Sequence, residues 1–175
     1  MLTHPSGRPH HEQFDGRFWN AFTEAEAFAW AQDIAALGFV EFVETEGAPD
    51  LKAGEFWVEA KTIEESEAER QETERLVKDS GGMLFRGPIR LVPPDEGLIG
   101  KLDRQANDAV KKWRRQSSGR LITFFDLRTI DFGISRDQAL ADVANWARRK
   151  AHADGTSIVV CFNHRWRAPF VVEGL

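Results

Sequence analysis

The chain has 175 residues, a hydrophobic fraction of 42% and a net charge of −5, which suits one folded domain spanning residues 1–175. It contains no apolar run near the roughly 18 residues of a membrane helix, and its first residues lack the apolar core of a signal peptide. Cys161 is the only cysteine, so a disulfide framework is excluded, and we expect a cytoplasmic protein that does not enter a membrane.

The charges are distributed unevenly along the chain. Residues 1–75 carry 17 acidic and 6 basic residues, a net charge of −11, whereas residues 76–175 carry 11 acidic and 17 basic residues, a net charge of +6. This asymmetry suits a basic binding face in the second half and an acidic, metal-attracting first half. A solvated surface whose charges happen to segregate explains it equally well.

The hydrophobic periodicity predicts a mixed β-sheet flanked by helices. The expected elements are a helix over 23–37, strands over 39–45, 50–53 and 55–62, a helix over 95–116, a strand over 121–127, a helix over 135–154, and strands over 157–162 and 168–172. Residues 1–17 are expected to form a flexible arm. The charged stretch 63–79 predicts either a solvated helix or a partly disordered segment.

Two helix starts are predicted from capping residues. Thr23 is a candidate N-cap, with Glu26 three residues later at the capping-box position, and Gly38 ends that helix. Asp95 is the candidate cap of the helix over 95–116, whose apolar stripe consists of Leu98, Leu102, Ala106, Ala109, Val110 and Trp113.

One short region combines residues that suit metal-assisted chemistry. Side chains alternate along a strand, so Glu59 and Lys61 point to one face while the apolar residues between them point to a core. A turn at Gly54 would fold Asp50 back beside Glu59. Two carboxylates and an ammonium on one face can hold a hard divalent cation and orient a water. The alternative is that Glu59 and Lys61 form a polar pair on the wet face of an edge strand.

This arrangement resembles the PD-(D/E)xK nuclease superfamily, and within it the Holliday-junction-resolvase-like members most. The resemblance rests on Glu26 in a helix, Gly38-Phe39 at a strand entry, the Asp50–Gly54 turn and Glu59-Ala60-Lys61. It covers residues 23–62 well and the next helix and strand weakly. It implies a restriction-endonuclease-like core of helix, three strands, helix and strand. Residues 63–94 would then be an insertion, followed after the core by a C-terminal helix and two strands.

The resemblance also implies roles for individual residues. Asp50, Glu59 and the backbone carbonyl of Ala60 would bind Mg²⁺ or Mn²⁺, and Lys61 would position the attacking water. Glu26, or as a second choice Glu24, would complete the catalytic set, although helix capping explains Glu26 as well. Residues Lys101 and Gln105 lie one helical turn apart, off the apolar stripe, so they could face the site or be plain solvated positions.

Two basic clusters are candidate nucleic-acid contacts. The first is the helix end with Lys111, Lys112, Arg114 and Arg115, which would also interact favourably with the helix dipole, and the second comprises Arg165 and Arg167 beside Trp166. We therefore expect a Mg²⁺-dependent DNA endonuclease acting in restriction, repair or mobile-element defence. The alternatives are a catalytically inactive nuclease-like fold that binds nucleic acid or protein, and an enzyme that cuts RNA. A homodimer would supply one site for each DNA strand.

Overall fold

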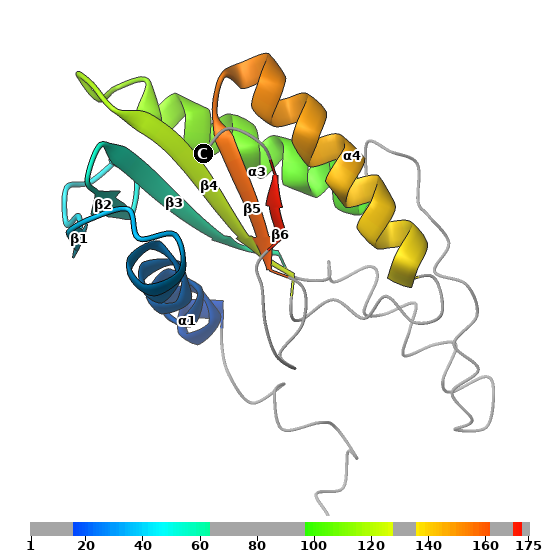
Figure 1. Ribbon diagram of the computed structural model, residues 1–175, viewed down its shortest axis with the longest axis horizontal. Coiled ribbons are helices and arrows are strands. Elements are labelled where there is room, and N and C mark those ends of the chain that lie inside the picture. Colours follow the sequence, from blue (N-terminus) through cyan, green and yellow to red (C-terminus); the bar gives the residue numbers. More distant parts are fainter. Residues whose placement is uncertain (1–15, 64–96, 128–135, 162–169, 173–175) are drawn as a thin grey trace, which may run out of the picture.

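The computed structural model describes residues 16–63, 97–127, 136–161 and 170–172. Its helices are α1 (Gly16–Ala29), the π-helical turn η2 (Trp30–Ile34), α3 (Leu98–Trp113) and α4 (Arg136–Asp154). Its strands are β1 (Val40–Phe42), β2 (Leu51–Ala53), β3 (Phe56–Thr62), β4 (Arg120–Asp126), β5 (Ser157–Cys161) and β6 (Phe170–Val172), all seen in Figure 1. The predicted mixed α/β class is confirmed. Most of the expected arm and insertion lies outside the described residues.

The strands form one mixed sheet in the order β1 to β6. The first three strands form an antiparallel meander, β4 and β5 run parallel to β3, and β6 is antiparallel to β5. Parallel neighbours need a crossover connection, and α3 and α4 occupy the two crossovers in the chain. The order of elements from α1 to β4 is therefore helix, three strands, helix and strand.

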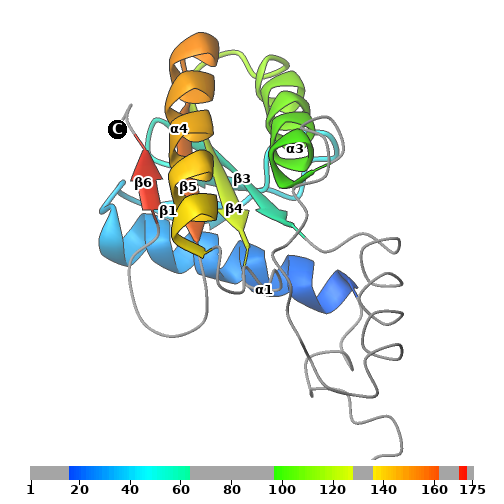
Figure 2. The same cartoon turned by 90° about the vertical axis from the view of Figure 1, so that its right-hand side faces the viewer.

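Helices cover both faces of the sheet, with α1 on one side and α3 and α4 on the other (Figure 2). On the α1 side, Trp30 packs in one buried cluster with sheet residues that include Val58 and Phe124. On the opposite side, Leu102 and Trp146 pack in a second cluster with Phe125. Because β4 is covered on both faces, its side chains from Leu121 to Asp126 are all buried.

The first helix begins earlier than the sequence pattern predicts. It starts at Gly16, so Gly16 and Arg17 belong to α1 rather than to an arm, and Thr23 lies inside the helix. The N-cap assignment of Thr23 is therefore wrong. Its hydroxyl Oγ1 donates a hydrogen bond to Asp126 Oδ2 (2.9 Å) and lies 2.8 Å from Thr62 Oγ1. Thr23 thus joins α1 to the ends of β3 and β4.

Removing this hydroxyl will destabilise the fold. Thr23→Val keeps the shape of the side chain but deprives the buried Asp126 carboxylate of one donor, and we expect a loss of about 2 kcal/mol in the free energy of unfolding. Thr23→Ser keeps the hydroxyl and is the matched control. Urea unfolding of both variants measures the effect. A Thr23→Val protein as stable as Thr23→Ser would contradict the importance of this contact.

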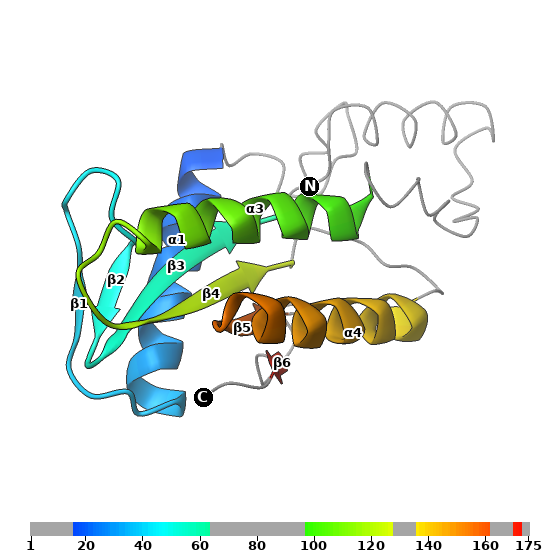
Figure 3. The same ribbon diagram turned by 90° about the horizontal axis from the view of Figure 1, so that it is seen from above.

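The helix α3 confirms the predicted apolar stripe but not the predicted start. The buried residues of α3 are Leu102, Ala106, Ala109 and Val110, all from that stripe. The helix begins after Gly97, which is its N-cap residue. Asp95, the predicted cap, lies outside the described residues. Figure 3 shows α3 and α4 side by side over the sheet. Among the described residues, no helix is long and apolar enough to cross a membrane.

Candidate active site

The hairpin of β2 and β3 brings Asp50 to Glu59. Leu51 pairs with Val58, so the same antiparallel register extended by one residue sets Asp50 opposite Glu59. The turn between the strands contains Gly54, whose φ of 55° is a left-handed conformation that favours glycine. The Ala60 amide donates a hydrogen bond to Asp50 Oδ2 (2.8 Å). The turn and the approach of Asp50 are as the sequence predicts.

Glu59 is the most buried charged group of this cluster, with 0% of its surface exposed. Two ammonium groups contact the same carboxylate oxygen, Oε1: that of Lys61 at 2.5 Å and that of Lys112 at 2.6 Å. Within the described residues, the second oxygen, Oε2, is buried and has no hydrogen-bond partner. Because Glu59 is fully buried, the alternative of a polar pair on the wet face of an edge strand is wrong.

Lys112 belongs to the carboxylate cluster, which the sequence analysis did not predict. As part of a basic helix end it is expected to contact nucleic acid, yet its ammonium lies 2.6 Å from Glu59 Oε1 and 3.9 Å from Asp50 Oδ1. The spacing of residues along α3 does indicate that Lys112 could face the site. Residues seven apart occupy nearly the same face of a helix, so the face of α3 that carries Gln105 also carries Lys112 two turns later.

The site opens at the side of β3 that β2 leaves unpaired. β2 pairs only with residues 56–58, so the strand from Glu59 onward is paired on the β4 side alone. The amide and carbonyl of one strand residue point to the same side, so the Ala60 carbonyl faces the Asp50 side of β3 together with its amide. The side chains of Lys61, Asp50 and Lys112 are 20%, 23% and 31% exposed, so solvent reaches the cluster.

Burial and charge both act on the protonation of this cluster. Burial, and next the repulsion from Glu59, raise the pKa of Asp50 to about 6, and the Ala60 hydrogen bond and the two lysines only partly oppose this. Burial alone would lower the pKa of Lys112. The hydrogen bond to Glu59 and the attraction of Glu59, Asp50 and Glu24 outweigh burial, so the pKa of Lys112 is raised and the group stays charged.

Glu24 and Glu26 both lie on α1, the layer on the other face of the sheet, and both are partly buried. Glu24 is among the charges that act on Lys112, so it lies near enough to the site to influence it. The catalytic role of Glu26 stays a prediction. Lys101 and Gln105 are partly exposed on α3, and their proposed contact with the site is likewise a prediction.

The remaining basic residues of the first cluster lie on the surface. Lys111 donates to Asp108 Oδ1 at 2.8 Å, and Arg114 and Arg115 are exposed. The hydrogen bond from Lys111 is the main reason why the pKa of Asp108 is lowered, and the charges of Lys61 and Arg104 add to it. The outer surface of α3 therefore carries positive charge next to Lys61. Arg165 and Arg167 lie outside the described residues.

The oxygen atoms of this cluster could coordinate a magnesium ion whose remaining ligands are water molecules. Within the described ranges, no group of three or more His, Cys, Asp and Glu side chains gathers into a metal site. Mg²⁺, however, is commonly held by one or two carboxylates and several waters. Among the residues that the structure describes, Glu59 Oε2 has no hydrogen-bond partner, and Asp50 Oδ1 has only the distant Lys112 at 3.9 Å. These two oxygens and the Ala60 carbonyl are the ligands that the geometry offers.

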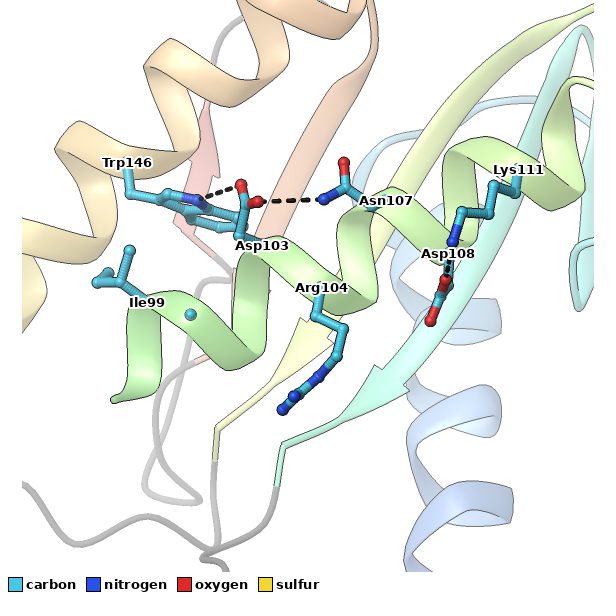
Figure 4. Close-up of a pocket in the computed structure, with 8 residues that line it drawn as sticks. Ile99, Asp103, Arg104, Asn107, Asp108, Lys111 and Trp146 are labelled. Carbon is cyan, nitrogen blue, oxygen red and sulfur yellow. Dashed lines mark hydrogen bonds and ion pairs between the residues drawn. The ribbon is translucent and has the colours of Figure 1, made fainter. Parts of the chain in front are cut away.

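A separate groove of about 490 Å³ is lined by residues of α3 and by Trp146 of α4 (Figure 4). Asp103 accepts hydrogen bonds there from Trp146 Nε1 (3.3 Å) and Asn107 Nδ2 (3.1 Å). Lys150 donates to Asn107 Oδ1 (2.7 Å) and pairs with Asp103 at 3.4 Å. These contacts hold the two helices together. The groove contains neither Asp50 nor Glu59, and its Asp103 side chain is 46% exposed, so it is not the candidate active site.

No protein-family model, no curated protein and no solved structure matches this chain. The function is therefore inferred from the residues of the site and their geometry.

Proposed function

We propose that this protein is a divalent-metal-dependent nuclease that hydrolyses phosphodiester bonds in DNA. The observation that carries the proposal is the buried Glu59 carboxylate, whose Oε2 has no hydrogen-bond partner within the described part of the chain and lies in one cluster with Asp50. A buried carboxylate oxygen without a donor is costly in free energy, and a bound cation would remove that cost. Burial, and next the charge of Glu59, raise the pKa of Asp50 to about 6, so its ionised carboxylate is also poorly compensated in the metal-free fold.

Each residue has a role that its position supports. Asp50, Glu59 and the Ala60 carbonyl would hold Mg²⁺ or Mn²⁺, which supplies Lewis-acid stabilisation of the charge that builds on a phosphate. Lys61, 20% exposed and anchored to Glu59, would orient the attacking water and offer a positive charge to the phosphate. The basic outer surface of α3, with Lys111 and Arg104, would attract a polyanion toward the open side of β3.

The element order supports the same proposal. The PD-(D/E)xK core that the sequence resembles consists of a helix, three strands, a helix and a strand, and this chain has that order from α1 to β4. Asp50 directly precedes β2, and the Glu-x-Lys sequence lies on β3. A homodimer and a cytoplasmic location stay predictions.

A cleavage assay tests the proposal. End-labelled single-stranded, duplex and branched DNA, and a matched RNA, are incubated with the protein in an excess of Mg²⁺ or Mn²⁺, with a chelator control. We expect cutting of at least one DNA substrate only when metal is present. Lys61→Ala should lower the rate about 100-fold or more, because one electrostatic contact to the transition state contributes on that order.

Arg148→Ala is the control for this loss, since Arg148 is an exposed residue of α4 and carries no proposed role. It should cut at the wild-type rate. Metal-independent cutting, or equal rates for Lys61→Ala and Arg148→Ala, would contradict the assignment of the site. Cutting of RNA alone would change the substrate class and leave the site in place.

One observation favours a second function, a nuclease-like fold that binds nucleic acid or protein without cutting. The two carboxylates of Asp50 and Glu59 are matched by the two ammonium groups of Lys61 and Lys112, so the cluster is close to neutral without any metal. A purely structural ion cluster would have this property. Absence of divalent-metal binding in calorimetry, together with folded protein, would favour the second function.

A further inference from the structure

Lys112 occupies the space between the two candidate metal-binding carboxylates. Its ammonium is in contact with Glu59 Oε1 at 2.6 Å and lies 3.9 Å from Asp50 Oδ1, so the two oxygens are at most about 6.5 Å apart. A cation with ligands near 2.1 Å that binds both residues must lie in the same small region. Lys61 contacts only Glu59 among these two carboxylates, since it extends from the same strand.

An ammonium and a divalent cation cannot share this region without a large electrostatic cost. Two like charges a few ångströms apart repel strongly wherever solvent is partly excluded, and the repulsion doubles when one of them is divalent. Glu59 is fully buried, so water screens little of this repulsion at its side of the cluster. The Lys112 side chain, in contrast, is 31% exposed and begins on the last turn of α3, from which it can reach solvent.

We propose that Lys112 is a built-in counter-cation of this site, which neutralises Asp50 and Glu59 in the metal-free protein and must leave them when a divalent cation binds. The inference rests on the proposed metal site. It explains how a buried Glu59 is tolerated in the metal-free fold. It also makes Lys112 a residue that weakens metal affinity, which is the opposite of the effect expected for a ligand or a residue that merely supports the fold.

Calorimetric titration of the full chain with Mn²⁺ alone, without DNA, tests this proposal. Lys112→Gln should bind Mn²⁺ about tenfold more tightly than the wild type, which corresponds to about 1.4 kcal/mol. Lys112→Arg keeps the positive charge and should bind within about twofold of the wild type, since a guanidinium also pairs with carboxylates. Lys111→Gln is the matched control, because Lys111 pairs with Asp108 instead, and it should also bind like the wild type.

The outcomes separate this proposal from the proposed function. Equal Mn²⁺ affinity for the wild type and Lys112→Gln, with both binding, overturns the role of Lys112 and leaves the metal site in place. Weaker binding by Lys112→Gln also overturns it. No binding by any variant overturns the metal site itself. Circular dichroism establishes that each variant is folded, and Lys112→Met replaces Lys112→Gln if the latter is not.

Discussion

Replacing Asp50 by Asn will make the metal-free protein more stable at pH 8 while it removes metal binding and cutting. The folded pKa of about 6 exceeds the ordinary value of 3.8, chiefly because of burial and then because of Glu59. Asn carries no charge, and its side-chain oxygen can still accept the hydrogen bond from the Ala60 amide. We expect a gain of about 2 kcal/mol in the free energy of unfolding at pH 8 and a loss of about 1,000-fold or more in cutting.

The sign of this effect follows from proton binding. Because the folded pKa is raised, protonated Asp50 contributes stability that is fully present below pH 3.8 and is lost as the pH rises through about 6. The advantage of Asp50→Asn over the wild type should therefore be small near pH 4 and reach its full size above pH 7. Urea unfolding between pH 4 and 8 with a chelator present measures both limits.

Asp108→Asn is the matched control for Asp50→Asn, since it is the same substitution at an exposed carboxyl whose pKa is lowered. It should give no gain in stability at pH 8. Added Mg²⁺ should stabilise the wild type by mass action but leave Asp50→Asn unchanged. If Asp50→Asn is less stable than the wild type at pH 8, the ionised carboxylate is not a cost to the metal-free fold, and the account of its pKa is wrong.

The part of the site that is local in sequence could be predicted from the sequence. Asp50 and Glu59 are nine residues apart and are joined by one turn, so strand alternation and Gly54 are enough to bring them together. The same alternation puts Lys61 beside Glu59. The order of the longer elements also follows from hydrophobic periodicity, whereas β1, β2 and β6 have three residues each and are indicated mainly by the turns and longer strands beside them.

The burial of Glu59 and its contact with Lys112 could not be predicted in this way. These two residues are 53 positions apart, and only the packing of α3 over β3 joins them. A run of basic residues at a helix end looks the same whether it faces solvent or a buried carboxylate. Thr23 shows a similar limit, since its partner Asp126 is 103 positions away and a Thr-x-x-Glu pattern occurs inside helices as well as at their starts.

The hairpin that holds the site depends on Gly54, and Gly54→Ala will destabilise the protein strongly. Gly54 has a φ of 55°, which costs an alanine about 1 kcal/mol, and a Cβ at this position would collide with the backbone carbonyl oxygen of Leu37. The collision partner is backbone and cannot rotate away, so relief requires movement of the hairpin. We expect a total loss of about 3 kcal/mol in the free energy of unfolding.

Gly155→Ala is the control that separates the cost of the steric collision from the cost of the left-handed backbone conformation. Gly155 also has a positive φ, 65°, but a Cβ there would meet no atom within 4 Å, so only the conformational cost of about 1 kcal/mol should appear. Guanidinium unfolding of the two variants gives the difference directly. Because movement of the hairpin would also draw Asp50 away from Glu59, Gly54→Ala should bind Mn²⁺ more weakly than Gly155→Ala. Equal stability of the two variants would mean that the Leu37 carbonyl yields freely and that the hairpin does not hold the two carboxylates in a fixed relation.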